Sequence, residues 1–263
     1  MAGKILTTPA VVLRRYPLGE SDRILVLYTK EHGLIRAVAK GARKSKKRYG
    51  GILDLLYHLE VELTRRKSPL LLLGHARLID AYRPLSLELM RLAAGCYLAE
   101  VAASFAAEEQ PETETFNALT AALRGLCNGK DAGALSRLVE LRTLDHAGLA
   151  PRLDICTVTG RLLREDETTA FEPHRGGTVC LNKALPHSPR LAPATRRAMC
   201  RALACPLPEA LRIDWTREQS IEARAAMQAM ITYHTSRPLY SRAFAEAAAR
   251  YLRERKKAAG AGQ

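Results

Sequence analysis

The sequence has few aromatic residues and no long hydrophobic run. Only 5% of its 263 residues are Phe, Trp or Tyr, and a single Trp is present. No apolar stretch approaches the ~20 residues of a membrane-spanning helix, so we expect no membrane contact. Residues 1–4 lack the apolar core of a secretory signal, which predicts a cytoplasmic protein. The six cysteines are then expected to be thiols rather than a disulfide framework.

The common catalytic and cofactor-binding signatures are also absent from the sequence. It contains no Gly-x-x-x-x-Gly-Lys-Ser/Thr loop, Gly-x-Gly-x-x-Gly turn, His-Glu-x-x-His pair or Gly-x-Ser-x-Gly elbow. The seven histidines show no pairing typical of a metal site or a general base. We therefore predict no enzymatic activity and no cofactor. A nuclease built from scattered carboxylates stays open as an alternative.

Positive charge is abundant but unevenly distributed. Residues 1–83 contain 17 Lys/Arg and 7 Asp/Glu, a net charge of +10, within a chain of net charge +14. Residues 84–249 contain 19 residues of each sign, and residues 250–263 add the remaining +4. Solubility alone does not require such a partition. It predicts a polyanion-binding surface in the first third of the chain, with a possible second contact from the C-terminal tail.

The charge is densest between Lys40 and Arg48, where six of nine residues are basic. Gly41 and Gly50-Gly51 bracket this run, which predicts a loop held between strands. Lys and Arg release condensed counterions from nucleic-acid phosphates, giving salt-dependent binding. Tyr49, beside the run, is the best stacking candidate. The predicted DNA-binding residues are Lys40, Arg43, Lys44, Lys46, Lys47, Arg48, Tyr49, Arg14, Arg15, Arg36, Arg65, Arg66 and Lys67.

Short strands and turns dominate the first third of the chain. Residues 59–64 alternate apolar and polar, which places Leu59, Val61 and Leu63 on a core face. Further strands are expected near residues 11–16, 23–28, 34–40 and 70–73. Five strands in ~75 residues predict a small barrel of the oligonucleotide-binding (OB) kind. An SH3-like barrel has similar spacing and stays open.

After Pro84 the pattern becomes helical. Leu85, Leu89, Leu92 and Cys96 recur at spacings of 4, 3 and 4 residues, which predicts one amphipathic helix. Further Ala/Leu-rich helices are expected at 113–126, 132–146, 193–204 and 218–235. Together with the barrel they predict a multidomain α+β protein containing a helical bundle.

Residues 150–192 interrupt the helical pattern and are expected to form a ribbon or loop. They hold four prolines, the pair Gly176-Gly177, and two cysteines 24 residues apart, Cys156 and Cys180. A structural zinc site needs four N or S ligands, commonly from two Cys-x-x-Cys turns. Thr159 and Lys183 stand where the second thiols would be, and the spacing of His174 and His187 matches no common turn. We therefore predict no metal.

Several ordered segments together suggest a family. These are Ala10-Val-Val-Leu-Arg14, Gly19-Glu-Ser-Asp-Arg23-Ile-Leu, His32-Gly-Leu, Ala37-Val-Ala-Lys40-Gly-Ala-Arg43-Lys, Glu140-Leu-Arg-Thr-Leu-Asp-His-Ala-Gly148, Gly176-Gly-Thr-Val-Cys180 and Arg237-Pro-Leu-Tyr-Ser241-Arg242. In order, over about residues 9–244, they resemble the RecO family of bacterial DNA repair and recombination mediators. Tyr240 departs from that family's pattern, which has lysine there.

The resemblance implies an OB-fold barrel, a helical domain and an inserted zinc-finger-like ribbon. We accordingly expect an OB-fold domain at 1–83, helical parts at 84–149 and 193–257, a metal-free insert at 150–192, and a disordered tail at 258–263. It also implies binding of single- and double-stranded DNA and annealing of complementary strands. The implied partners are RecR, the acidic tail of single-strand binding protein, RecA and often RecF, in the nucleoid of a bacterial cytoplasm.

One further residue role comes from the resemblance. Arg137 is similar to a basic residue implicated in gripping the acidic tail, although a solvated arginine near a helix end is an equally good interpretation. A ribosomal or RNA-chaperone barrel, which shares the basic surface, stays open as an alternative to DNA repair.

Overall fold

A computed structural model describes residues 4–44, 49–65, 68–108, 110–235 and 239–260. The chain divides into two compact units, Met1–Cys127 (unit 1) and Asn128–Gln263 (unit 2). Among the described helices, none is both long and apolar enough to cross a membrane. All six cysteines are free thiols. The predicted domain limits stay predictions.

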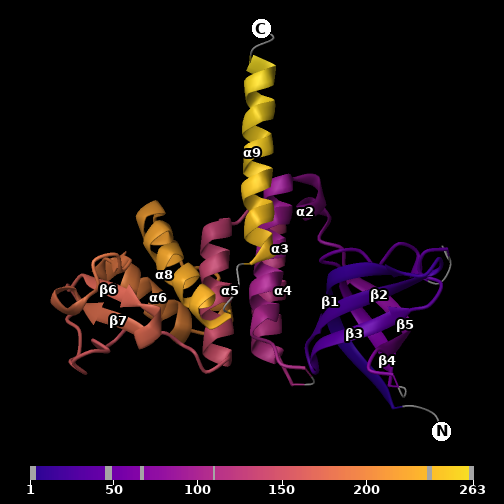
Figure 1. Ribbon diagram of the computed structural model, residues 1–263, viewed down its shortest axis with the longest axis horizontal. Helices are drawn as coiled ribbons and strands as arrows, with labels where there is room; N and C mark the ends of the chain where they lie inside the picture. The colour runs from indigo at the N-terminus through magenta and orange to yellow at the C-terminus, as the bar shows by residue number, and fades with distance from the viewer. Residues whose placement is uncertain (1–3, 45–48, 66–67, 109, 236–238, 261–263) are drawn as a thin grey trace. The chain divides into compact units, whose positions relative to one another are not determined.

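Five strands of unit 1 form a closed barrel (Figure 1). They are β1 (Ile5–Leu18), β2 (Asp22–Thr29), β3 (Gly33–Ala39), β4 (His58–Thr64) and β5 (Leu71–Asp80). Around the barrel the order is β1-β2-β3-β5-β4, with β3 and β5 parallel and the other pairs antiparallel. An OB fold has such a five-stranded Greek-key barrel, so the predicted fold class is confirmed.

The barrel core follows the alternation of the sequence. Leu59, Val61 and Leu63 of β4 have no exposed surface, as the pattern predicted. Leu25 and Leu27 of β2 are equally buried, while Ile24 and Val26, on either side of Leu25, are only partly covered. Because strand side chains alternate between faces, this assigns an inner and an outer face to each strand.

The described residues of unit 1 also form the helices α2 (Arg83–Leu87), α3 (Leu89–Ser104) and α4 (Thr113–Cys127). The single helix predicted from Leu85 to Cys96 is wrong, because Glu88 is extended (φ −131°, ψ 115°) and separates α2 from α3. Leu85 is buried, but the buried side of α3 consists of small and branched residues such as Ala93, Leu98 and Val101.

Two buried contacts fasten the barrel to its neighbouring segments. The Tyr28 hydroxyl of β2 donates to a Glu112 carboxylate oxygen at 3.3 Å. The His58 ring at the start of β4 packs edge-on against Phe116 of α4, with ring centroids 5.5 Å apart. Burial lowers the pKa of His58, and its ring nitrogens have no hydrogen-bond partner among the described residues. In unit 1, a buried hydrogen bond and a ring contact therefore connect the barrel to the segments that follow it.

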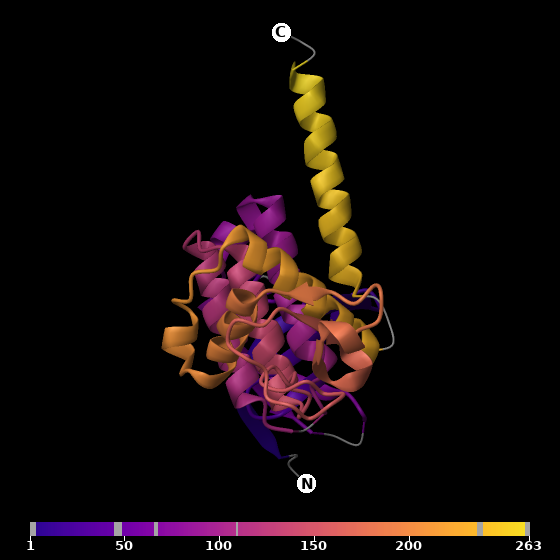
Figure 2. The same ribbon diagram turned by 90° about the vertical axis from the view of Figure 1, so that its left-hand side faces the viewer.

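Unit 2 contains the remaining helices: α5 (Ala132–His146), α6 (Pro193–Ala204), α7 (Leu207–Ala210), α8 (Arg217–Thr235) and α9 (Tyr240–Gly260). The helices predicted at 113–126, 132–146, 193–204 and 218–235 are confirmed as α4, α5, α6 and α8. Figure 2 shows α9 as one continuous helix. It includes residues 258–260 of the tail that was expected to be disordered.

The stretch between α5 and α6 forms the expected ribbon. Its strands are β6 (Thr169–Glu172), β7 (Gly177–Cys180) and β8 (Arg190–Leu191), arranged β7-β6-β8 and joined by the short turns η1 (Pro173–Arg175) and η2 (Leu181–Lys183). A parallel bridge between Arg152 and Gly177 and an antiparallel bridge between Ile155 and Leu162 attach the preceding loop. The ribbon thus has a regular backbone framework.

Candidate nucleic-acid interface

The outer face of strands β1, β2 and β3 carries two rows of side chains. Arg14 lies opposite Val26, and Val26 lies opposite Arg36, which gives a row with a cation at each end. Tyr16, Ile24 and Val38 form the next row, and the Tyr16 side chain is 45% exposed. OB folds bind oligonucleotides on the face formed by their second and third strands, and both rows cross that face.

The basic turn after β3 is fastened to the turn between β1 and β2. The Arg43 backbone N–H donates to the Ser21 carbonyl at 2.9 Å, and its guanidinium donates to the Gly19 carbonyl at 2.6 Å. A carboxylate oxygen of Asp22 accepts the Gly41 N–H at 2.8 Å. This bond, with that from the Ser21 hydroxyl, lowers the pKa of Asp22. The cations at 40–44 are therefore held on an ordered turn.

Arg65, at the end of β4, lies near the same face. Strand β5 separates β4 from β3, with Leu72 opposite both Thr64 and Val38. Arg65, which follows Thr64 and is exposed, is therefore two strands away from β3. Neighbouring strands are ~4.8 Å apart, so about 10 Å separates these backbones. The barrel register thus gathers residues that are about 30 positions apart in the sequence.

Carboxylates neutralise part of this surface. Arg15 pairs with Asp54 at 3.0 Å, Lys44 with Glu20 at 3.5 Å, and Arg14 with Glu100 at 3.8 Å. These arginine and lysine side chains stay substantially exposed, and exposed pairs contribute only ~0–1 kcal/mol. A phosphate can therefore compete with the carboxylate for such a cation.

Three of the predicted cations differ in this respect. Arg36, Lys40 and Arg43 are exposed, and none of them forms an ion pair with a carboxylate of the described residues. Arg36 belongs to the outer row of β3, whereas Lys40 and Arg43 belong to the fastened turn. Five predicted residues, Lys46, Lys47, Arg48, Arg66 and Lys67, lie outside the described residues.

The predicted stacking role of Tyr49 is wrong. Its side chain is only 3% exposed and belongs to the barrel core, and its hydroxyl donates to the Leu73 carbonyl at 3.0 Å. A ring enclosed by core side chains offers no face to a base. Tyr16 is the aromatic side chain on the outer face, and it was missed as a site residue. The signal was available, since Tyr16 is two positions from Arg14 and so shares its face.

The assignment of Arg137 to partner binding is also contradicted. Its side chain is 3% exposed, and its guanidinium makes two contacts with the Glu140 carboxylate, one of them at 2.6 Å. Glu140 has no exposed surface. Both the gripping of an external acidic tail and the alternative of a solvated arginine require exposure. The buried ion pair within α5 satisfies this charge instead.

The ribbon does not present a zinc site. Cys156 and Cys180 are neighbours, but no group of three potential metal-ligating His, Cys, Asp or Glu side chains occurs in the described parts of the chain. The Arg161 guanidinium lies 3.2 Å from the Cys180 sulfur. A cation in that place repels a metal ion, and two thiols leave a tetrahedral zinc site half built. These residues therefore do not fit the metal that the resemblance implied.

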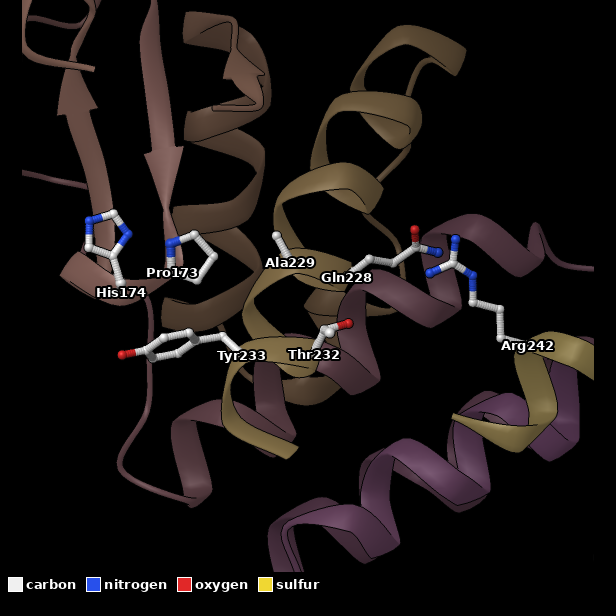
Figure 3. Close-up of a pocket in the computed structure, with 7 residues that line it drawn as sticks. All are labelled: Pro173, His174, Gln228, Ala229, Thr232, Tyr233 and Arg242. Carbon is white, nitrogen blue, oxygen red and sulfur yellow. The ribbon is translucent and has the colours of Figure 1, made fainter. Parts of the chain in front are cut away.

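Unit 2 has a pocket of about 430 Å³, shown in Figure 3. The Gln228 and Arg242 side chains extend toward one another on one side of it, and Tyr233 lies on the other side. Arg242 also pairs with Glu246 at 3.4 Å. The lining residues are Pro173, His174, Gln228, Ala229, Thr232, Tyr233 and Arg242. All of them belong to unit 2, so the pocket is separate from the barrel surface.

Comparison with known proteins gives matches over nearly the whole chain. The family model described as "Recombination protein O N terminal" matches residues 1–82, and the one described as "Recombination protein O C terminal" matches residues 86–243.

Individual relatives match over similar lengths. The chain is 36% identical over 237 residues to DNA repair protein RecO of Anaeromyxobacter sp. (strain K), covering 89% of this chain and 93% of the relative. It is 32% identical over 245 residues to DNA repair protein RecO of a Nocardioides species (strain ATCC BAA-499 / JS614), covering 90% and 97%. It is also 32% identical over 238 residues to that of Myxococcus xanthus (strain DK1622), covering 88% and 93%.

Proposed function

Because the chain belongs to the RecO family of DNA repair proteins, we propose that its barrel binds single- and double-stranded DNA and anneals complementary strands during recombination. The observation that carries this proposal is the partition of charge, since residues 1–83 hold +10 of the total +14. The exposed Arg36, Lys40 and Arg43 on one side of the barrel support it.

The mechanism we propose is electrostatic and requires no covalent step. Two DNA strands repel each other through their phosphates, and cations on the barrel reduce that repulsion while releasing condensed counterions. Holding both strands on one surface then raises the local concentration of complementary bases. Because no bond is made or broken and no nucleotide is consumed, the protein would act as a mediator rather than as an enzyme.

The proposed partners follow from the family. We infer that the protein works with RecR, and often with RecF, to load RecA onto DNA covered by single-strand binding protein, in a bacterial cytoplasm. Residues 84–249 carry equal numbers of acidic and basic residues, which leaves that part suited to protein contacts rather than to phosphate. A buried Arg137 does not serve as the grip for the acidic tail, so another surface has to do so.

An annealing assay tests the proposal. The triple variant Arg36→Gln, Lys40→Gln, Arg43→Gln removes three charges, and its glutamine at 43 can still donate a hydrogen bond to Gly19. The matched control Arg212→Gln, Arg217→Gln, Arg224→Gln removes three exposed charges from unit 2. We expect slower annealing of labelled complementary strands by the barrel variant and unchanged annealing by the control. Equal annealing by both variants would contradict the proposal.

Labelled strands also distinguish the proposal from the two alternatives, a nuclease and an RNA chaperone. Shortened labelled strands after incubation with Mg²⁺ or Mn²⁺ would indicate a nuclease, and stronger binding of structured RNA than of DNA would indicate an RNA chaperone. Annealing on strands covered by single-strand binding protein, compared with a form lacking its acidic tail, tests the proposed partner. We expect the protein to anneal strands covered by the tail-less form more slowly than strands covered by the full-length binding protein.

A further inference from the structure

The ribbon of unit 2 holds two neighbouring thiols that the proposed DNA-binding role does not use. Cys156 has no exposed surface, Cys180 is 7% exposed, and both pack in a small cluster with Val179, Leu163 and Ala184. The Cys180 backbone N–H donates to the Cys156 sulfur at 3.2 Å. The two thiols also hydrogen-bond to each other, although 24 residues separate them in the sequence.

The backbone around the two thiols is well tied together. The Cys156 N–H donates to the Arg161 carbonyl at 2.8 Å, and its own carbonyl accepts from Gly160 at 2.8 Å, which closes a tight loop. The Thr157 N–H donates to the Thr178 carbonyl at 2.9 Å, linking that loop to β7. Cys180 ends β7 and pairs with Thr169 of β6. The thiols are thus positioned by two backbone elements that hydrogen-bond to each other.

Two polar groups complete the surroundings of the thiols. The Arg161 guanidinium donates to the Cys180 sulfur at 3.2 Å and to a Glu167 carboxylate oxygen at 2.6 Å. Burial disfavours a thiolate, but hydrogen bonds from the Thr159 side chain and from the Cys180 backbone and thiol outweigh it, lowering the pKa of Cys156 to about 6. Burial and the bond to Cys156 raise the pKa of Cys180. One thiol is therefore set up as nucleophile and the other as proton donor.

We propose that Cys156 and Cys180 form an oxidisable dithiol, which a hydroperoxide converts into an intramolecular disulfide. The Cys156 thiolate attacks one peroxide oxygen, the O–O bond breaks, and the departing oxygen takes a proton and leaves as water, giving a sulfenic acid. The Cys180 sulfur then attacks the Cys156 sulfur, the S–O bond breaks, and a second water leaves. Two thiols are oxidised, and one hydrogen peroxide is reduced to two waters.

The new bond would have a defined structural effect. A disulfide has an S–S length of roughly 2.0 Å, so two thiols that already hydrogen-bond to each other would have to move closer to form it. The bond would join the 156–160 loop covalently to the end of β7. Oxidation should therefore tighten the ribbon, whereas the reduced form depends on hydrogen bonds alone.

Peptide mapping of the full-length chain tests this directly, because trypsin separates the cysteines. Residues 153–161 contain only Cys156, and residues 176–183 contain only Cys180. We expect limiting hydrogen peroxide, followed by alkylation and digestion without reductant, to give the linked pair of these peptides as the main cysteine product. Oxidation of Cys200 or Cys205, both of intermediate exposure, at doses that leave 153–161 and 176–183 fully alkylated would overturn the proposal.

Variants assign the order of steps and control for nonspecific oxidation. In Cys180→Ser, whose hydroxyl can still donate to Cys156, a dimedone-type trap should label Cys156 as sulfenic acid. The control Cys200→Ser, Cys205→Ser should keep the linked peptide at the wild-type yield. A linked peptide that disappears in this control would mean that the disulfide forms by exchange through other thiols, which contradicts a self-contained pair. The wild-type mapping does not depend on any variant folding.

Discussion

Three exposed cations of the barrel and several arginines of unit 2 differ in their surroundings. In unit 2, Arg137, Arg161 and Arg175 pair with Glu140, Glu167 and Glu172. Others donate to backbone carbonyls, as Arg196 does to Leu153 and Arg142 does to Cys205. On the barrel, Arg36, Lys40 and Arg43 make no ion pair with a described carboxylate.

This difference separates two uses of one residue type. A guanidinium whose charge is compensated by a carboxylate stabilises the fold and attracts an anionic ligand only weakly, whereas an exposed cation without a carboxylate partner can attract a polyanion. By sequence range, residues 1–83 carry a net charge of +10, whereas residues 84–249, which include the helices of unit 1 and most of unit 2, sum to zero. Substitution within the buried Arg137–Glu140 pair should consequently affect stability, and substitution of the exposed barrel cations should affect DNA binding.

The largest effect is expected from breaking the buried pair in α5. Glu140→Gln leaves the Arg137 charge buried without its counter-ion, which typically costs ~3–5 kcal/mol in the free energy of unfolding. Urea denaturation followed by circular dichroism measures this loss. The control is Asp154→Asn, which breaks the exposed pair with Arg152 and should cost only ~0–1 kcal/mol. Equal losses in both variants would remove the distinction between buried and exposed arginines.

The next effect concerns the aromatic side chain on the outer barrel face. Tyr16→Ala should weaken binding of single-stranded DNA by ~1–3 kcal/mol if its ring stacks on a base. Duplex binding should change little, because paired bases are already stacked on each other. Fluorescence anisotropy with matched single- and double-stranded probes measures both affinities. Equal weakening of the two would assign Tyr16 to barrel packing instead.

A smaller, pH-dependent effect is expected in unit 1. Burial lowers the pKa of His58 below its ordinary 6.5, so the unfolded chain binds the proton more readily than the folded one. Stability is therefore fully present above the unfolded pKa of about 6.5 and is lost as the pH falls below it toward the lower folded-state pKa. Urea midpoints at several pH values measure the loss. His58→Phe, which keeps ring contacts with Phe116, should reduce it; an unchanged pH dependence would exclude His58 as its source.

The smallest effect is expected at a cation that a carboxylate already holds. Arg15 pairs with Asp54 at 3.0 Å, and both side chains are about equally exposed. Arg15→Gln should change DNA affinity less than Arg36→Gln does, because breaking an existing ion pair offsets part of any gain from phosphate. DNA titrations of the two variants at one salt concentration measure the two affinities. A larger loss from Arg15→Gln would reverse the ranking drawn from the ion pairs.

The fold was largely predictable because it depends on local patterns. Strict alternation identified β4, and Ala/Leu periodicity identified α4, α5, α6 and α8 to within a residue or two at most ends. The break at Glu88 was not predictable from spacing, since residues 85–96 keep an apolar period that the backbone does not follow.

The site was only partly predictable because burial is a tertiary property. Basic residues in turns can be recognised in the sequence, but the side on which Tyr49 lies depends on how its segment closes the barrel core. Arg137 likewise resembled a surface residue, yet α5 buries both it and Glu140. Cross-strand neighbours such as Arg14, Val26 and Arg36 required the register, which no single segment determines.

The salt dependence of DNA binding tests the central claim most directly. Each phosphate contact to a single strand contributes about −0.7 to the slope of log K against log salt concentration. If Arg36, Lys40 and Arg43 contact phosphates, replacing all three with Gln should make the slope less steep by about 2. The Arg212, Arg217 and Arg224 control should keep the wild-type slope. An unchanged slope in the barrel variant, or an equal change in the control, would contradict the assignment of DNA binding to the barrel.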